Sequence, residues 1–355
     1  MKKGLSTAYA VMNTLLLIAG YVLVFYFAWG KGTDAMISLL VGIAEGFIAA
    51  PIFHELGHLF FAQIGKMEYV YLKAFCFRFV RKNGKVKFSF ASPFAADETQ
   101  VVPKCGGNMK KRTKRYVLGG LLSEGFVLFI LLGVAILVTV LGGFPFVLWG
   151  MIPYFAYLFL LNVIPANYAS GKTDVAVYFG IKKDEAAEKN MLAAMEIQGQ
   201  LYEGKSFSEI DKSLYFNQPQ LCEDEPLFAI MLDLRYRYYL ETHDFEQAAD
   251  QLNRLAQSQA YLFDEEVEKI VAELAYMHAI NNDEEMAREC EKLCASFLEQ
   301  NTLSAYRIKA ALAYLYGDIN EAKAQKECAK QTLEQERIKG NTKFEGILLS
   351  RINLE

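Results

Sequence analysis

Ile43–Phe61 reads IAEGFIAAPIFHELGHLFF, and this stretch decides the fold of the N-terminal half. Apart from Glu45, Pro51 and the motif His54-Glu55-Leu56-Gly57-His58, each of its residues is Ala, Phe, Ile, Leu or Gly. Two histidines and a glutamate are unfavourable in hydrocarbon unless a cation or a polar partner compensates them. The stretch therefore predicts a membrane-spanning helix that carries a functional site.

The spacing within the motif indicates a zinc site. Residues four apart share one face of a helix, so His54 and His58 can reach the same metal ion. Glu55 then lies beside the remaining coordination position, where it can take a proton from a water molecule. Glu45 precedes His54 by nine residues, and we expect it to form an interhelical hydrogen bond or to be a protonated carboxyl rather than to bind the metal.

The first half contains four apolar runs, each long enough for a membrane span of about 20 residues. They are Thr7–Trp29, Met36–Phe61, Tyr116–Leu141 and Phe144–Ile164. Residues 1–180 contain 17 Lys and Arg against eight Asp and Glu, whereas residues 181–355 contain 20 against 33. We predict a mainly α-helical polytopic membrane protein whose acidic C-terminal half is a soluble α-helical repeat domain.

Basic residues between the second and third runs predict the orientation. Lys66–Arg115 carries thirteen Lys and Arg, whereas the short linkers Gly30–Ala35 and Gly142–Gly143 carry one between them. By the positive-inside rule, this segment and both termini lie in the cytoplasm of a protein integral to the plasma membrane, and the segment contacts lipid headgroups. All six cysteines then face the reducing side, and we expect Cys290 and Cys294 to be packing residues.

Alternation of apolar and polar residues predicts a β-hairpin within the basic segment. Phe75–Phe79 and Val86–Phe90 both alternate, and Asn83-Gly84 between them is a strong turn signal. Such a hairpin, apolar on one face and basic on the other, would lie on the membrane surface. It serves either as a packing element or as an edge strand that pairs with an extended substrate.

Polar residues from three separate segments are expected at one depth in the membrane, close to the cytoplasmic boundary. They are His54, Glu55, His58, Ser123, Glu124, Asn162 and Asp174. Asp174 opens a short apolar run that either Thr173 or Ser170 can cap. Residues that only pack have no reason to align in this way, so the convergence indicates one site.

In these motifs the chain resembles the site-2 protease family of intramembrane zinc metalloproteases. That family combines a membrane HExxH motif, a GxxxN/S/G pattern on the next core helix, and an Asn-x-x-Pro stretch followed by an aspartate ligand. The matches here are His54-Glu55-x-x-His58, Gly119-x-x-x-Ser123, and Asn162-x-x-Pro165 with Asp174. They fall in residues 36–182, the expected core of a transmembrane metalloprotease domain over residues 1–182.

The resemblance implies a zinc endopeptidase with one zinc ion per chain. It makes His54, His58 and Asp174 the zinc ligands and Glu55 the general base. It also implies that Asn162 and Ser123 contact the substrate backbone or the oxyanion. The family's aspartate is usually followed by Gly, whereas Asp174 is followed by Val175, and Glu124 is the alternative third ligand.

The implied substrates are transmembrane or membrane-inserted peptide segments, cut near the cytoplasmic face. A transmembrane helix hides its peptide bonds in backbone hydrogen bonds, so it must unwind locally before attack. Pairing of the unwound segment with a strand such as Lys85–Ala91 would offset the lost backbone hydrogen bonds.

A degenerate repeat follows in the acidic half. Ala248, Ala287 and Ala322 occupy equivalent positions, each after an apolar helix and a short turn. The pattern resembles a tetratricopeptide array, which has a period of 34 residues. We predict such repeats over residues 226–355, after a linker and helical lead-in over residues 183–225. Arrays of this kind commonly hold a protein partner, and the alternative is a plain helical bundle.

Two other functions fit the sequence less well. A non-catalytic membrane scaffold would act through the C-terminal repeats, but it has no need of a buried acid at Glu55. A transporter would use Glu45 and Glu124 as a proton relay and would not depend on a metal. No Gly-rich phosphate loop or nucleic-acid motif is evident, so we expect no nucleic-acid partner.

Overall fold

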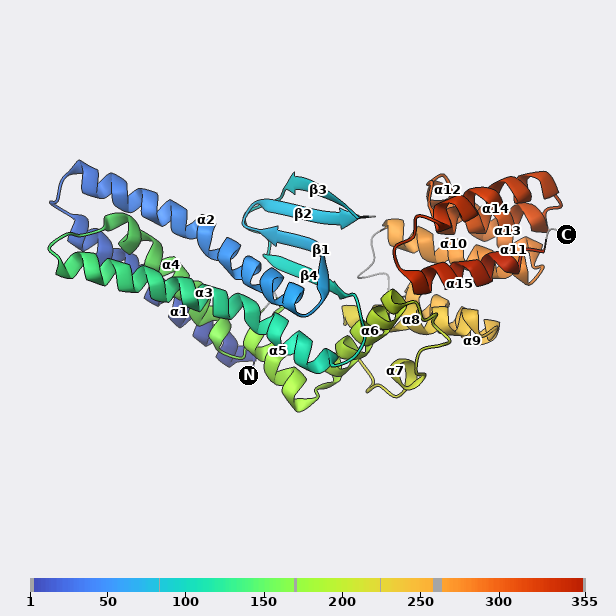
Figure 1. Cartoon of the computed structure of the whole chain (residues 1–355), viewed down its shortest axis with the longest axis horizontal. Helices are drawn as coiled ribbons and strands as arrows, with labels where there is room; N and C mark the ends of the chain where they lie inside the picture. Colours follow the sequence, from blue (N-terminus) through green and yellow to red (C-terminus); the bar gives the residue numbers. More distant parts are fainter. Residues whose placement is uncertain (1–2, 83, 169–170, 224, 258–263, 354–355) are drawn as a thin grey trace. The chain divides into compact units, whose positions relative to one another are not determined.

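The computed structural model describes residues 3–82, 84–168, 171–223, 225–257 and 264–353. The structure is mostly helical, at 70% helix, and it forms two compact units. The first unit comprises Met1–Val102 and Asn108–Glu188, and the second comprises Pro103–Gly107 and Lys189–Glu355. Figure 1 labels the helices and strands of both units.

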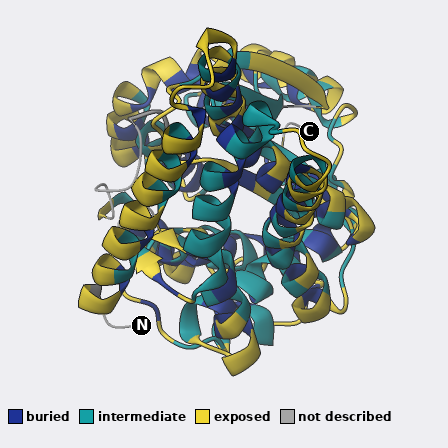
Figure 2. Ribbon diagram, turned by 90° about the vertical axis from the view of Figure 1, so that its left-hand side faces the viewer, coloured by how far each residue is buried: buried dark blue, intermediate teal, exposed yellow. Residues whose placement is uncertain are grey.

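Four helices of the first unit are long and apolar enough to cross a membrane, as the sequence predicts. They are α1 (Lys3–Ala28), α2 (Thr33–Ile64), α3 (Met109–Val140) and α4 (Phe146–Val163). Most of the large apolar side chains that are exposed belong to these four helices. The helix that starts near the N-terminus carries long exposed stretches (Figure 2). Outward-facing apolar side chains are what lipid contact requires, so the four helices are compatible with a membrane protein.

Helix α2 packs against both α3 and α4 at positions where a side chain would not fit. A Cβ on Gly57 would lie 2.5 Å from Ser123 Cβ, and a Cβ on Gly119 would lie 2.6 Å from the Gly57 carbonyl oxygen. The small residues Gly119 and Ser123 of α3 therefore lie in close contact with α2. This contact brings the histidines of α2 against the backbone of α3.

The basic segment forms a four-stranded sheet in the order β3-β2-β1-β4. Its strands are β1 (Met67–Ala74), β2 (Phe77–Lys82), β3 (Lys85–Phe90) and β4 (Glu98–Pro103). The predicted hairpin corresponds to β2 and β3, with Asn83 outside the described residues. The sheet lies beside the C-terminal end of α2 (Figure 1). Two strands, β1 and β4, are additional to the hairpin that alternation predicts.

One part of the hairpin prediction is wrong. Phe75 has a left-handed backbone, with φ of 55°, and lies in the turn between β1 and β2 rather than in a strand. Asp97 holds this turn, since its Oδ1 accepts hydrogen bonds from the Phe75 amide at 2.7 Å and from Lys73 Nζ at 2.9 Å. The remaining phenylalanines do share one face, with Phe77 opposite Phe90 and Phe79 opposite Phe88.

The chain leaves α4 through two short strands and enters α5. These elements are β5 (Asn167–Tyr168), β6 (Gly171–Lys172) and α5 (Asp174–Lys183). Thr173 caps α5, because its Oγ1 accepts from the Ala176 amide and also donates to the Ile164 carbonyl at 2.8 Å. Of the two expected caps, Thr173 is therefore the one observed, and Ser170 lies outside the described residues.

The described residues of the second unit contain ten helices. They are α6 (Ala186–Glu203), α7 (Ser213–Phe216), α8 (Pro226–Glu241), α9 (Phe245–Gln257), α10 (Asp264–Ile280), α11 (Glu284–Leu293), α12 (Ala295–Leu298), α13 (Leu303–Leu315), α14 (Ile319–Leu333) and α15 (Lys339–Ser350). Helix α6 straddles the division at Glu188, six residues beyond the boundary expected from composition. Cys290 and Cys294 are buried among these helices, as expected.

The second unit also includes the segment Pro103–Gly107, which composition assigns to the membrane domain. Its backbone packs where Gly199 of α6 has no side chain, so a Cβ there would overlap the Cys105 carbonyl. The Gly107 amide also donates to both carboxylate oxygens of Glu196, at 2.8 and 2.9 Å. Because these contacts involve the backbone, the residue types of Pro103–Gly107 do not predict that the segment belongs to the second unit.

Three helix pairs of the second unit turn in the same way. A residue with left-handed φ stands at the turn of each pair: His243 before α9, Asn282 before α11 and Gly317 before α14. The aspartate that follows each of them accepts a hydrogen bond from an amide three residues later, at 3.0–3.3 Å. The turns thus recur with the alanine spacing seen in the sequence, while assignment to the tetratricopeptide class stays a prediction.

Candidate metal centre

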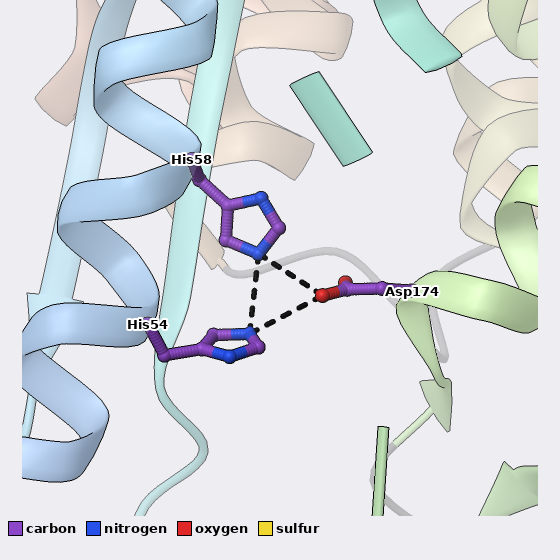
Figure 3. Close-up of side chains that lie close together, drawn as sticks. All are labelled: His54, His58 and Asp174. Carbon is purple, nitrogen blue, oxygen red and sulfur yellow. Dashed lines mark hydrogen bonds and ion pairs between the residues drawn. The ribbon is translucent and has the colours of Figure 1, made fainter. Parts of the chain in front are cut away.

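Three potential ligand atoms converge in the first unit. Nε2 of His54 and Nε2 of His58 lie 3.2 Å apart, and Asp174 Oδ2 lies 3.3 Å from the first and 3.4 Å from the second (Figure 3). Ligands held about 2.0–2.1 Å from a tetrahedral zinc ion are about 3.3–3.4 Å from one another. The spacing of the three atoms therefore fits a small divalent cation, and the group can hold a metal ion.

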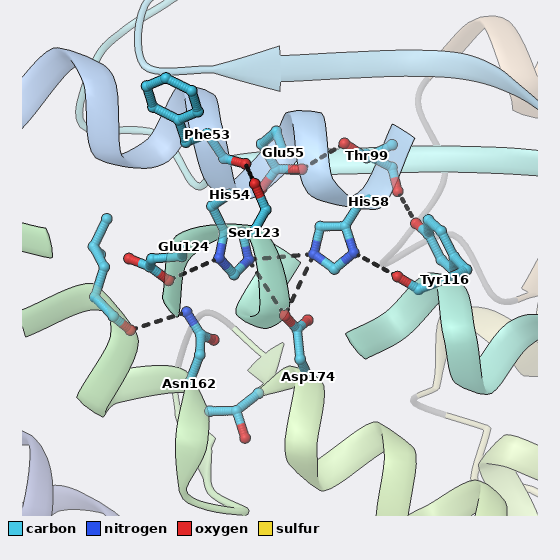
Figure 4. Close-up of polar contacts among 12 residues, drawn as sticks. Phe53, His54, Glu55, His58, Thr99, Tyr116, Ser123, Glu124, Asn162 and Asp174 are labelled. Atoms are coloured by element: carbon cyan, nitrogen blue, oxygen red, sulfur yellow. Dashed lines mark hydrogen bonds and ion pairs between the residues drawn. The ribbon is translucent and has the colours of Figure 1, made fainter. Parts of the chain in front are cut away.

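The hydrogen bonds made by Nδ1 of each imidazole determine whether its Nε2 is protonated or has a free lone pair. His54 Nδ1 lies 3.0 Å from Glu124 Oε2, and His58 Nδ1 lies 2.9 Å from the Tyr116 carbonyl oxygen (Figure 4). Carboxylate and carbonyl oxygens accept hydrogen bonds, so each Nδ1 is the donor and carries the ring proton. A neutral ring then turns the lone pair of its Nε2 towards Asp174.

Three acceptor atoms thus face one another in a buried place. His54 and His58 are buried, and Asp174 Oδ2 has no hydrogen-bond donor within the described part of the chain. An ionised carboxylate at Asp174 offers only acceptor oxygens to the two rings. An arrangement of this kind is stable when a cation lies among the acceptors.

Glu124 is not positioned to replace Asp174 as third ligand. Its carboxylate is fully buried, at 0% exposure, and contacts the outer nitrogen of His54 rather than the nitrogen that faces Asp174. A carboxylate in this position fixes the ring orientation and increases the basicity of the metal-binding nitrogen. Glu124 is thus placed to orient His54 from the outer side, whereas Asp174 is the carboxylate that lies beside both Nε2 atoms.

Gly120 leaves room for the two imidazoles. A Cβ at this position of α3 would overlap His58 Nε2 and would lie 2.7 Å from His54 Nε2. Both atoms belong to rigid rings, so neither could move aside without losing the convergence. Gly119 and Gly120 are adjacent in the sequence, but the structure shows that they have different neighbours. Gly119 contacts the backbone of α2, and Gly120 faces the two imidazole rings.

A residue of the β-sheet positions the side chain of Glu55 through a hydrogen bond. Its carboxylate is buried and accepts a hydrogen bond of 2.5 Å from Thr99 Oγ1 on β4. The Thr99 carbonyl accepts from the Tyr116 hydroxyl, and the Tyr116 carbonyl is the partner of His58 (Figure 4). Thr99 and Tyr116 thus connect the acid to one of the histidines. Sequence inspection missed both, since neither has an unusual type or spacing.

The other predicted site residues lie around this group with different contacts. Ser123 Oγ donates to the Phe53 carbonyl at 2.8 Å and so joins α3 to α2. Asn162 Nδ2 donates to the Leu158 carbonyl of its own helix at 3.3 Å, and Figure 4 shows it on the Glu124 side of the centre. Glu45 is exposed on α2 and takes no part in the group.

Comparison of the chain with known protein families, curated proteins and solved structures gave no match. The chemistry of the site therefore has to be argued from its own geometry. That geometry combines three side chains that could hold a metal ion with the buried carboxylate of Glu55, and both histidines lie on a helix long and apolar enough to cross a membrane. Such a combination can bind a divalent cation and transfer a proton beside it.

Proposed function

We propose that the protein is a membrane-embedded zinc endopeptidase that cleaves transmembrane or membrane-inserted peptide segments. One observation carries the proposal: acceptor atoms of His54, His58 and Asp174 converge, and Glu55, which follows His54 on α2, is buried as well. A metal site with three protein ligands keeps one position open, which is the arrangement of catalytic rather than structural zinc. The HExxH spacing on α2 supplies both histidines and the acid from one helix.

Zinc bound to these residues would polarise the scissile carbonyl and lower the pKa of the attacking water. Glu55 takes one proton from that water and later delivers it to the leaving amine. The Thr99 hydroxyl engages Oε2 of Glu55, which leaves Oε1 to carry the proton. Glu124 holds His54 in orientation through the outer nitrogen during the same steps.

The substrate is an extended backbone segment, and β4 is the strand suited to pair with it. Both β3 and β4 are edge strands of the sheet, but β4 also carries the hydrogen-bond donor of Glu55. A segment added along β4 would have its peptide bonds close to the acid, whereas Lys85–Ala91 lies at the opposite edge. Backbone pairing would offset the hydrogen bonds that a substrate helix loses on unwinding.

We place the protein in the plasma membrane with both termini in the cytoplasm, on the basis of its Lys and Arg distribution. Substrates would then be cut close to the cytoplasmic face. The helices of the second unit would recruit a membrane-protein substrate or a protein partner, by the same logic that applies to helical arrays. These statements extend the proposal and stand or fall with it.

Cleavage is the first test. We would co-express single-span membrane proteins with the wild type, with Glu55→Gln and with Glu45→Gln, an exposed glutamate of the same helix that serves as a matched control. Fragments should form with the wild type and Glu45→Gln and should decrease about 10²- to 10⁴-fold with Glu55→Gln, the range for loss of a general base. If no cleavage depends on Glu55, the protein is a non-catalytic scaffold.

Metal content is the second test. Purified wild type should contain about one zinc ion per chain, and His54→Ala should contain almost none. His278→Ala is the control, because this histidine pairs with Asp283 in the second unit and has no part in the group. Equal zinc content in the wild type and His54→Ala would contradict the proposal.

A further inference from the structure

A cavity of about 550 Å³ lies in the first unit at the N-terminal end of α3. Phe61 of α2 and Tyr178 of α5 contribute to its wall, and the other lining residues belong to α3 or precede it by one position. Four of the nine lining residues are Lys or Arg, and none is Asp or Glu. The cavity is therefore an open, strongly positive groove lined by residues of three helices.

The polarity of the cavity changes along the axis of α3. Five of the six residues from Lys110 to Arg115 are basic, whereas from Tyr116 to Leu141 the only charged residue is Glu124. The cavity spans this change, with cations at one end and Phe61, Leu118 and Leu122 at the other. Leu122 lies seven residues beyond Arg115, or about 10 Å along the helix. A basic end and an apolar end at this spacing match the headgroup and acyl depths of a lipid.

The cations of the cavity are not all neutralised by the protein. Lys110 pairs with Asp184 at 2.7 Å, and Lys114 lies over the Tyr178 ring, 5.6 Å from its centroid. Lys111 and Arg115 are exposed, and no described carboxylate pairs with either of them. The N-terminal end of a 32-residue helix adds further positive potential at the same place. An anion is needed to balance this end of the cavity.

We propose that this cavity binds one anionic phospholipid. Lys111, Lys114 and Arg115 would contact the phosphodiester, and an acyl chain would lie along Phe61 and Leu122. A zwitterionic lipid fits less well, because its own cation would be repelled by the same side chains. The inference rests on membrane insertion of the four helices and does not depend on catalysis.

The position of the lipid would connect it to the metal centre. Phe61 lies on α2 three residues after His58, and Tyr178 lies on α5 four residues after Asp174. A lipid held between α3 and these two residues would stabilise the approach of α5 to α2. An anionic lipid should therefore also raise the thermal stability of the first unit.

The test uses the full chain in a neutral detergent with added phosphatidylglycerol or phosphatidylcholine, and native mass spectrometry measures the lipid retained. We expect one tightly retained phosphatidylglycerol and a preference over phosphatidylcholine of about 30-fold, which two unpaired cations provide. Lys111→Gln/Arg115→Gln should lose this preference, whereas Lys111→Arg/Arg115→Lys should keep it. Lys85→Gln/Lys87→Gln, which removes two exposed lysines of β3, is the matched control and should also keep it.

Several results would overturn the proposal. Equal retention of the two lipids by the wild type would exclude a headgroup-selective site. An equal loss of preference in the β3 control would mean that overall charge, not the cavity, attracts the lipid. Thermal protection by inorganic phosphate alone that matches phosphatidylglycerol would assign the site to a soluble anion. Binding of an acidic peptide in place of the lipid would assign it to a substrate tail.

Discussion

Both compact units contain a buried polar cluster, and the two clusters differ in whether hydrogen-bond donors face acceptors within them. In the second unit, the fully buried Arg307 donates to Glu345 at 2.7 Å and to Glu273 at 2.7 and 2.9 Å. The Tyr236 hydroxyl donates to Glu273 at 2.8 Å. Every one of these contacts joins a donor to an acceptor, although Arg307 Nη1 has no hydrogen-bond partner in the described part of the chain.

The cluster of the first unit lacks this complementarity. The two Nε2 atoms and Asp174 Oδ2 are all acceptors once the Nδ1 protons are assigned to Glu124 and the Tyr116 carbonyl. Burial of polar residues is thus no mark of a functional site, since both clusters are buried. What distinguishes a ligand-binding group is a set of acceptors that the protein itself leaves unmatched.

The largest effect is expected where the donor–acceptor cluster of the second unit is broken. Arg307→Met leaves two carboxylates buried without their cation and should reduce the stability of the second unit by about 3–5 kcal/mol. Hydrogen exchange of α10, α13 and α15 in the full chain measures this change. Arg288→Met is the control, because its exposed pair with Glu284 is worth about 0.3–0.5 kcal/mol. A similar response to both variants would mean that Arg307 contributes no more than a surface pair.

Acid should weaken the same cluster. Burial raises the pKa of Glu273, but the Arg307 guanidinium lowers it more, so the folded pKa is below the ordinary value of 4.5. A carboxyl with a lowered pKa stabilises the fold above its unfolded pKa and loses that contribution as pH falls through the folded pKa. Exchange of α10 and α13 amides should therefore accelerate, relative to the intrinsic rate, below about pH 4.5. Insensitivity to pH between neutral and strongly acid conditions would contradict the pairing.

The next largest effect is expected at Gly120, which leaves room for the imidazoles of His54 and His58. Gly120→Ala adds a methyl group that overlaps His58 Nε2 and lies 2.7 Å from His54 Nε2. Displacement of catalytic groups by about 1 Å reduces activity about 100-fold, so we expect a loss of this size together with most of the bound zinc. Gly133→Ala on the same helix meets no atom within 4 Å and should have neither effect. Zinc bound equally by both variants would show that the methyl group is tolerated.

A smaller effect is expected from the outer carboxylate. Glu124→Ala removes the hydrogen bond to His54 Nδ1 but leaves every atom of the ligand group, so zinc affinity should fall about 10- to 100-fold. Glu124→Gln, which can accept through its amide oxygen, should retain more of the affinity. Competition with a chelator measures both constants. If zinc binding disappears in Glu124→Ala as completely as in His54→Ala, then Glu124 is a ligand after all.

The two clusters also differ in how well sequence predicts them. His54, Glu55 and His58 are recognisable because imidazoles and carboxylates are rare in apolar runs and because the i,i+4 spacing has a geometric meaning, whereas the ligand role of Asp174 was implied by the family resemblance. The contact of Glu124 with Nδ1 of His54 was not predictable, because the position of a carboxylate along a helix does not determine which imidazole nitrogen it will contact. Thr99 and Tyr116 have ordinary types, and their contacts depend on a sheet of which only the hairpin has a sequence signal.

For the fold as well, local properties of the sequence were predictable and contacts between distant residues were not. Long apolar runs predicted the four helices of the first unit because length and hydropathy are local properties. Strands β1 and β4 and the attachment of Pro103–Gly107 to the second unit depend on backbone contacts with distant residues, which composition does not record. Arg307 is a similar case, because its residue type and position give no sign that it is fully buried between Glu273 and Glu345.

The smallest effect is expected from a glycine substitution in the second unit, where glycine is required for a different reason than in the first unit. Gly120 is needed for space, whereas Gly317 has φ of 82° and meets no atom within 4 Å, so only its backbone conformation requires glycine. Gly317→Ala should therefore destabilise the turn before α14 by about 1 kcal/mol, the penalty for an L-residue in the left-handed region. Gly346→Ala, within α15 and equally open, should instead stabilise its helix by about 0.5–1 kcal/mol. Hydrogen exchange in the full chain distinguishes the two signs. Equal responses would mean that the turn at Gly317 is not the left-handed turn it shares with His243 and Asn282, and the equivalence of the three helix pairs would fail with it.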